Sequence, residues 1–348
     1  MTEVYYPDVT VANVHTLQFI VVNPKTKKVE TERDDAIHQI KPLKIDSLSF
    51  QQINTAKSGE WKIIKTYTTD PNGNAVLMDV VFSGALRGYL VYVYYDPSLN
   101  NTGMGDTAWT EGETLFASEA NRTSALICEL CKFGEKTNGY LGVNDGLSQQ
   151  KSEGKIKDVY ANANAGNVVQ TARIDQSVSG DSVHTFRLVL GFGENAQAAL
   201  KAANSAARKG FNSLSKSYDA GWSAYVNSLP KVESKYQAQF NMAAMVLKAQ
   251  EDKTVPGANV ASLTVPWGGG VNANEDVGGG YHLIWSRDLY HVFTAYLAIG
   301  DRAAAERALD FLFKIQQKED GSFPQNSWLD GKTPRRSLLR SSHWDFGS

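Results

Sequence analysis

Aromatic, acidic and basic side chains that could bind a small polar molecule are concentrated between residues 266 and 328. A glycine-rich loop leads into a short run whose chemically active members are Tyr281, Trp285, Arg287 and Asp288. Aromatic faces pack on the apolar C–H faces of a pyranose, while guanidinium and carboxylate groups hydrogen-bond its hydroxyls directionally. Delivery of these four residues to the start of a helix therefore fits carbohydrate recognition.

The same residues also have a purely structural interpretation. Asp288 could cap the helix that follows, Arg287 could be its surface ion-pair partner, and Trp285 could belong to the core. Residue types alone leave both interpretations open. A second loop at 320–328, rich in amides and ending in Trp328, follows a helical hairpin. We expect it to return to the same end as the first loop, unless it is an ordinary exposed turn.

Two other motifs, a C-x-x-C and a glycine-containing run at 191–196, are weaker indications of a functional site. Cys128 and Cys131 form a C-x-x-C, but the chain has only two cysteines, and no His lies near them. A zinc site needs four ligands, or three and a water, so a buried structural pair is favoured over a redox or metal role. The run 191–196 imitates a dinucleotide fingerprint, but no second parallel strand follows to complete the unit. Its glycines are better explained by the chain's exit from a sheet.

The elements that must position these residues change type along the chain. Strand-like runs fill the first half, at 17–22, 61–69, 75–82, 89–95, 167–175 and 182–190. Pro71-Asn72-Gly73-Asn74 separates two of them and predicts a hairpin. Many short strands with turns between them favour a large antiparallel sandwich.

Helical spacing dominates the last third. Apolar residues recur on one face at 236–247, at 289–297 and at 304–315. Gly300 ends the second helix and Asp301 can cap the third, so this pair should form an antiparallel hairpin. We therefore predict a sandwich domain at 1–195, a helical linker at 196–230, and an all-α domain at 231–348 whose tail, 334–348, is atypical.

Composition narrows the class of protein. The 348 residues carry a net charge of −2, from 35 Lys and Arg against 37 Asp and Glu, which argues against a nucleic-acid binder. No apolar run is long enough to span a bilayer, and the start lacks the features of a signal peptide. We expect no membrane partner and a monomer. Localisation stays open between extracellular and cytoplasmic.

The pattern Tyr-x-x-x-Trp-x-Arg-Asp at 281–288 resembles bacterial glucoamylases and glucodextranases of glycoside hydrolase family 15. The other matching segments are Ala295-Tyr296, Gly300-Asp301, 321–326, Thr2-Glu3-Val4-Tyr5-Tyr6-Pro7 and Leu17-Gln18-Phe19. The resemblance covers nearly the whole chain to about Pro334. It implies an N-terminal antiparallel β-supersandwich followed by an (α/α)6 barrel, truncated here.

The resemblance also implies an activity and a site. The activity is exo-hydrolysis of terminal α-glucosidic bonds of starch and malto-oligosaccharides with inversion, releasing β-glucose. Tyr281, Trp285, Arg287 and Asp288 match the subsite for the terminal glucose, and Trp328 matches a neighbouring position. An α-glucan or oligosaccharide is the expected substrate. No organic cofactor is expected, whereas some members bind calcium through ligands that cannot be placed here.

The family's catalytic carboxylates have no match in this chain. Inversion needs an acid and a base roughly 6.5–9.5 Å apart, and we expect both to lie beyond residue 348. Glu275, Asp276, Glu319 and Asp320 are poor substitutes, since none is in an evidently desolvating environment. We therefore expect negligible activity from this chain, and a frameshift or truncation after Pro334 would explain the tail.

Four alternatives remain open at this point. A glucodextranase would differ only in preferring α-1,6 over α-1,4 bonds. A non-catalytic carbohydrate-binding fragment would bind glucans without turnover, and a purely structural fragment would bind none. A disaccharide phosphorylase also places a sandwich before an (α/α)6 barrel, and its activity would depend on phosphate.

Overall fold

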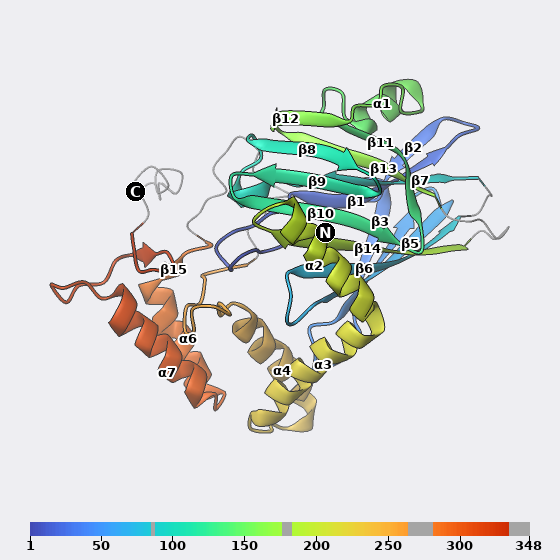
Figure 1. Cartoon of the computed structure of the whole chain (residues 1–348). Coiled ribbons are helices and arrows are strands. Elements are labelled where there is room, and N and C mark those ends of the chain that lie inside the picture. Colours follow the sequence, from blue (N-terminus) through green and yellow to red (C-terminus); the bar gives the residue numbers. More distant parts are fainter. Residues whose placement is uncertain (85–87, 176–182, 264–280, 334–348) are drawn as a thin grey trace, which may run out of the picture. The chain divides into compact units, whose positions relative to one another are not determined.

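The computed structural model describes residues 1–84, 88–175, 183–263 and 281–333 (Figure 1). The chain divides into two compact units. A sandwich unit contains Met1–Thr2, Asn13–Lys44 and Ser49–Ala220. A helical unit contains Glu3–Ala12, Ile45–Leu48 and Gly221–Ser348. A segment from the very start of the sequence therefore packs with the last third of the chain.

The sandwich unit consists of two antiparallel sheets. The five-stranded sheet has the order β11-β13-β7-β1-β2, with bounds β1 Thr16–Asn23, β2 Lys28–Thr31, β7 Leu90–Asp96, β11 Lys132–Tyr140 and β13 Val168–Asp175. The nine-stranded sheet has the order β12-β8-β9-β10-β14-β6-β5-β4-β3. Its bounds are β3 Ala36–Pro42, β4 Phe50–Ala56, β5 Trp61–Thr69, β6 Ala75–Gly84, β8 Asp106–Glu111, β9 Thr114–Glu119, β10 Arg122–Glu129, β12 Asn162–Gly166 and β14 Val183–Gly193.

Side chains between the two sheets form the core of this unit. Phe19 of β1 and Phe186 of β14 meet edge to face, with their ring centroids 5.5 Å apart. The Tyr95 hydroxyl of β7 donates to Ser124 Oγ of β10 at 2.9 Å. All eight residues of β1 are buried. The predicted antiparallel sandwich is confirmed.

The hairpin predicted from Asn72-Gly73 joins β5 to β6. The Gly73 N–H donates to the Asp70 carbonyl across the turn at 3.2 Å, and pairing begins with Thr69 opposite Val76. Asp70 also accepts from the Asn72 N–H at 3.1 Å, which is the local bond by which Asp favours turns.

Helix α2 (Ala196–Lys209) packs on the nine-stranded sheet through an alanine face that includes Ala199 and Ala203. Gly191 and Gly193 of β14 make the close approach possible. A Cβ on Gly191 would lie 2.4 Å from the Ala199 carbonyl oxygen, and one on Gly193 would lie 2.5 Å from the Ala199 nitrogen. The glycines of the fingerprint-like run thus provide room for a helix. Two smaller helices in this unit are η1 (Leu99–Asn101) and α1 (Gly146–Glu153).

Two helices occupy the segment predicted as a linker. These are α2 and α3 (Phe211–Ser228), and Phe211 and Leu214 at the start of α3 are buried in the sheet cluster around Leu77 and Val189. The predicted boundaries at 195 and 230 remain a prediction.

The helical unit contains the elements expected from the helix period. Their bounds are α4 Ser234–Ala249, α6 Ser286–Ala298, α7 Arg302–Phe311 and the π-helical turn η2 Leu312–Gln316, with two short strands, β15 Ile284–Trp285 and β16 Asn326–Ser327. Gly300 has a φ of 84° between α6 and α7, and Asp301 accepts from the Ala304 N–H at 3.0 Å. The predicted turn and cap are confirmed.

Two apolar clusters join α6 to α7 in the helical unit. The Tyr296 side chain of α6 packs with Ala304 and Ala305 of α7. A second cluster joins Leu289 to Ala308, Phe311 and neighbouring residues. Among the described residues, no helix is long and apolar enough to cross a membrane.

Candidate functional site

The two loops singled out from the sequence are joined by a small antiparallel sheet. Strand β15 comes after the first loop and β16 lies within the second, with Ile284 opposite Ser327 and Trp285 opposite Asn326. Trp328 follows β16 directly. The second loop therefore returns to the first, as predicted, and it is more than an ordinary exposed turn.

Buried polar groups hold the two loops together. The Gln316 amide nitrogen donates to the Ile284 carbonyl at 2.8 Å and to Ser327 Oγ at 2.9 Å, and Gln316 is buried. The Ser286 hydroxyl donates to the Pro324 carbonyl at 2.6 Å. Gln316 closes the π-helical turn η2, a kind of irregularity that often occurs at functional sites. Ile284, Ser286 and the second loop are thereby attached to the end of the α6–α7 hairpin.

The predicted sugar-binding side chains are exposed on this support. Tyr281 is 59% exposed, and the Arg287 and Asp288 side chains are 72% and 40% exposed. Arg287 donates to Asp288 at 3.2 Å, and its guanidinium carbon lies 5.7 Å from the centre of the Trp285 ring. A planar cation, a carboxylate and an indole thus lie next to one another at the start of α6.

The structural interpretation of these residues is correct in one part and wrong in two. Arg287 and Asp288 do form a surface pair, which contributes little stability by itself. Asp288 does not cap α6, because it lies inside the first turn and the cap position is Trp285. Trp285 is half-buried and so is not a core residue.

Four other carboxylates are possible catalysts by residue type, and they are Glu275, Asp276, Glu319 and Asp320. Glu275 and Asp276 lie outside the described residues. Glu319 and Asp320 are exposed. The Ser322 hydroxyl and N–H donate to Asp320 and hold the pKa of that carboxyl below its usual range. A general acid needs a raised pKa, so Asp320 does not fit that role.

Tyr5 and His282 are parts of this region that residue patterns did not indicate. The Tyr5 hydroxyl lies 3.0 Å from His282 Nε2, and its ring meets the imidazole edge to face at 5.2 Å. The two residues are 277 positions apart in the chain. No local signal could have paired them.

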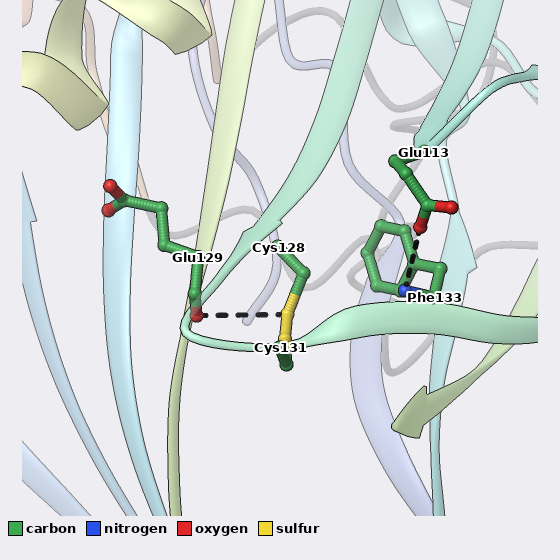
Figure 2. The surroundings of a disulfide bond; sticks show 5 residues. All are labelled: Glu113, Cys128, Glu129, Cys131 and Phe133. Atoms are coloured by element: carbon green, nitrogen blue, oxygen red, sulfur yellow. Dashed lines mark hydrogen bonds between the residues drawn. A yellow bond between two sulfur atoms is a disulfide. The ribbon is translucent and has the colours of Figure 1, made fainter. Parts of the chain in front are cut away.

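The C-x-x-C pair closes the turn between β10 and β11 in the sandwich unit (Figure 2). The two sulfur atoms are bonded to each other, so neither is free to bind a metal. Both residues are half-buried, and Leu130 between them is 69% exposed, so the predicted burial is wrong. The connection between β10 and β11 passes from the nine-stranded to the five-stranded sheet, and solvent reaches its side chains there.

No group of three or more His, Cys, Asp or Glu side chains that could hold a metal ion occurs in the part of the chain that the structure describes. No calcium ligands are therefore assigned.

Comparison with known proteins identifies the family. A model of the glucodextranase N domain matches residues 1–227, and a model of glycosyl hydrolases family 15 matches residues 234–325. The chain belongs to glycoside hydrolase family 15. The second match contains the whole Tyr281–Asp288 motif and strand β15, and it ends one residue before β16.

Individual relatives agree with this assignment. The family 15 chain is 36% identical over 339 residues to a glucoamylase from Clostridium sp. (strain G0005), a match that covers 95% of this chain and 47% of that protein. A crystal structure of a bacterial glucoamylase in complex with acarbose superposes with a TM-score of 0.87 at 35% identity, covering 95% of this chain and 49% of the other. The chain thus spans about half the length of these relatives, and its sandwich followed by part of a helical barrel matches theirs.

Proposed function

We propose that this chain binds the terminal glucose of an α-glucan for an exo-acting, inverting α-glucosidase of the glucoamylase type. Tyr281, Trp285, Arg287 and Asp288 contact the terminal sugar in this proposal, and Trp328 contacts a neighbouring one. The observation that supports it is the small sheet β15–β16, which pairs Trp285 with Asn326, two residues before Trp328.

The chemistry of these groups suits a sugar end. A guanidinium carries five N–H donors, and the pair with Asp288 at 3.2 Å uses only part of them. Both side chains remain exposed, so each can hydrogen-bond the hydroxyls of a terminal ring. The Trp285 and Tyr281 rings offer apolar faces for its C–H groups. Direct contact between these groups and the far edge of the last sugar would allow only a chain end to fit.

We assign neither catalytic carboxylate to a described residue. Asp288 is paired with Arg287, and the pKa of Asp320 is lowered, whereas inversion requires one carboxylic acid that stays protonated. In this proposal the chain therefore binds glucans by itself, and hydrolysis with release of β-glucose requires the acid and base of a longer family 15 catalytic domain.

Binding of maltotetraose and isomaltotetraose, measured by calorimetry on this chain, tests the proposal. Asp288→Asn and Arg287→Ala should each weaken binding of the preferred saccharide tenfold or more, because each removes a charged hydrogen-bonding group. Thermal stability should hardly change, since the pair is exposed. Arg302→Ala is the matched control, because Arg302 forms a comparable surface pair with Glu306 on α7. Equal binding by all variants would refute the assignment.

The same experiment separates the related functions. Preference for isomaltotetraose would indicate the glucodextranase specificity. Glucose release, followed by NMR of the product anomer with and without phosphate, tests the chemistry. Initial release of α-glucose would contradict inversion, and phosphate-dependent turnover would indicate a phosphorylase.

A further inference from the structure

The N-terminal segment Glu3–Ala12 is an integral part of the helical unit. It folds back on itself through a bridge between Tyr5 and Ala12, and the Tyr6 N–H donates to the Val11 carbonyl at 3.0 Å. The Val9 N–H donates to the carboxylate of Asp252 at 3.1 Å, and Asp252 is buried. This folded segment is therefore attached to the loop after α4 independently of any contact made by Tyr5.

The Tyr5 hydroxyl forms three further contacts. It lies 2.7 Å from the Leu263 carbonyl oxygen, 3.0 Å from His282 Nε2 and 3.4 Å from a carboxylate oxygen of Glu3. A hydroxyl has one hydrogen, and the carbonyl and the carboxylate can only accept it. The contact with His282 is therefore a bond from the imidazole Nε2–H to the tyrosine oxygen. Burial lowers the pKa of His282 to about 4, which agrees with this neutral form near pH 7.

Leu263 and His282 stand on the two sides of residues 264–280. Two backbone hydrogen bonds join the same two sides, from the Ser262 N–H to the Tyr281 carbonyl at 3.0 Å and from the Ala261 N–H to the Leu283 carbonyl at 3.1 Å. The single hydroxyl of Tyr5 bonds to both sides directly after this pairing. It therefore adds a third connection between the two sides, next to the backbone bond between Ser262 and Tyr281.

We propose that Tyr5 is a positioning residue for sugar binding, because its hydroxyl ties Leu263 to His282 and so fixes Tyr281 and the run to Asp288. Tyr5 acts through His282, which is buried directly beside the exposed Tyr281, and it need not touch the sugar. The inference rests on the proposed function of Tyr281, Trp285, Arg287 and Asp288.

A role limited to general stability fits the contacts less well. The two apolar clusters that join α6 to α7 contain neither Tyr5 nor His282. Removing the hydroxyl while keeping the ring leaves the Leu263 carbonyl and the His282 N–H without their partner, and both are at the base of the sugar-binding run. The effect should therefore be local to residues 261–263 and 281–285.

Tyr5→Phe, compared with wild type by amide hydrogen exchange and by saccharide binding, tests the inference. The amide of Ser262 should exchange about tenfold faster in the variant, and the dissociation constant for the preferred tetrasaccharide should rise about tenfold. Tyr296→Phe is the matched control. It also removes a buried hydroxyl of the helical unit, which donates to Asn259 Oδ1 or the Leu247 carbonyl, and neither acceptor belongs to residues 261–263 or 281–285. It should lower stability and leave both readouts unchanged.

Each outcome decides a different point. Unchanged exchange at Ser262 would show that the hydroxyl does not hold the loop base and would overturn the inference. Faster exchange with unchanged affinity would overturn the positioning role while leaving the proposed sugar site intact. Absence of saccharide binding by the wild type would refute the proposed function itself, and the inference with it, whatever the exchange rates.

Discussion

Replacement of Glu251 by Gln should destabilise the helical unit by about 2 kcal/mol at pH 7. Glu251 is buried and accepts two bonds from Arg307 of α7, at 2.7 and 2.9 Å. It also pairs with Lys248 of α4 and accepts from the Gly257 N–H at 2.9 Å. One carboxylate thus joins α4, the loop after it and α7.

The magnitude follows from the pKa of this carboxyl. Burial alone would raise it, but the hydrogen bonds from Arg307 and Lys248 overcome burial and lower the pKa from 4.5 to about 2. A shift of about 2.5 pH units corresponds to about 3 kcal/mol. The Arg307 and Lys248 side chains are 35% and 28% exposed, so solvent screening reduces the expected loss to about 2 kcal/mol.

The stabilisation by Glu251 should decrease as the pH falls. A carboxyl with a depressed pKa stabilises the folded state above its unfolded pKa, and the stabilisation is lost as the pH falls toward the folded pKa. The difference between wild type and Glu251→Gln should therefore be complete above about pH 4.5. Less than half of it should remain at pH 3, since most of the titration from pH 4.5 to 2 has then occurred.

Native-state hydrogen exchange is the suitable assay, because it reports the opening free energy of one unit within a larger chain. The amides of Tyr296 and Ala308 lie in the cores of α6 and α7 and report on the helical unit. Glu306→Gln is the control, since Glu306 and Arg302 form an exposed pair on α7 and should change the opening free energy by less than 0.5 kcal/mol. A loss below 0.5 kcal/mol for Glu251→Gln, or an equal loss at pH 7 and pH 3, would refute the reasoning.

Two further predictions concern the sandwich unit. Burial and the charge of Glu119 raise the pKa of Asp106 to about 8, so the stability of this unit should fall as the pH rises from about 4 to 8. Asp106→Asn should flatten that part of the pH profile in urea unfolding, and an unchanged slope would argue against it. Gly191→Val should cost 3 kcal/mol or more on the scale of overpacked cores, because its Cβ would overlap the Ala199 carbonyl. In a urea assay of the helical unit, the helical Gly221→Ala, which has open space around it, should instead stabilise that unit by about 0.5–1 kcal/mol.

The sequence predicted the elements whose signals are local. The Asn72-Gly73 hairpin and the Gly300-Asp301 turn are correct, because a turn residue and a cap act within four positions of themselves. The strand β3 had no such signal. It is the edge of the nine-stranded sheet, and Ile37 and Ile40 on it are 66% and 68% exposed, so neither alternation nor burial marks it.

The residues of the candidate site could be chosen from the sequence, but the groups that support them could not. Tyr281 to Asp288 were chosen because their residue types suit a sugar, which remains a prediction, and the return of the second loop followed from hairpin geometry. Gln316 gave no signal, since a glutamine in the last turn of an amphipathic pattern is normally exposed. Its burial results from the π-helical turn η2, and a one-residue change of helical pitch cannot be read from apolar spacing.

In the proposed site, exposed polar groups would bind the sugar and buried polar groups would hold them in position. Arg287 contacts Asp288 and Trp285, which leaves most of its donors for a ligand. Its backbone position is set by Gln316, which bonds to Ile284 three residues earlier. Groups that bind a ligand must stay exposed until it arrives, so their geometry has to be fixed by bonds made elsewhere. Variants of Gln316 should therefore impair sugar binding without altering any group that contacts the sugar.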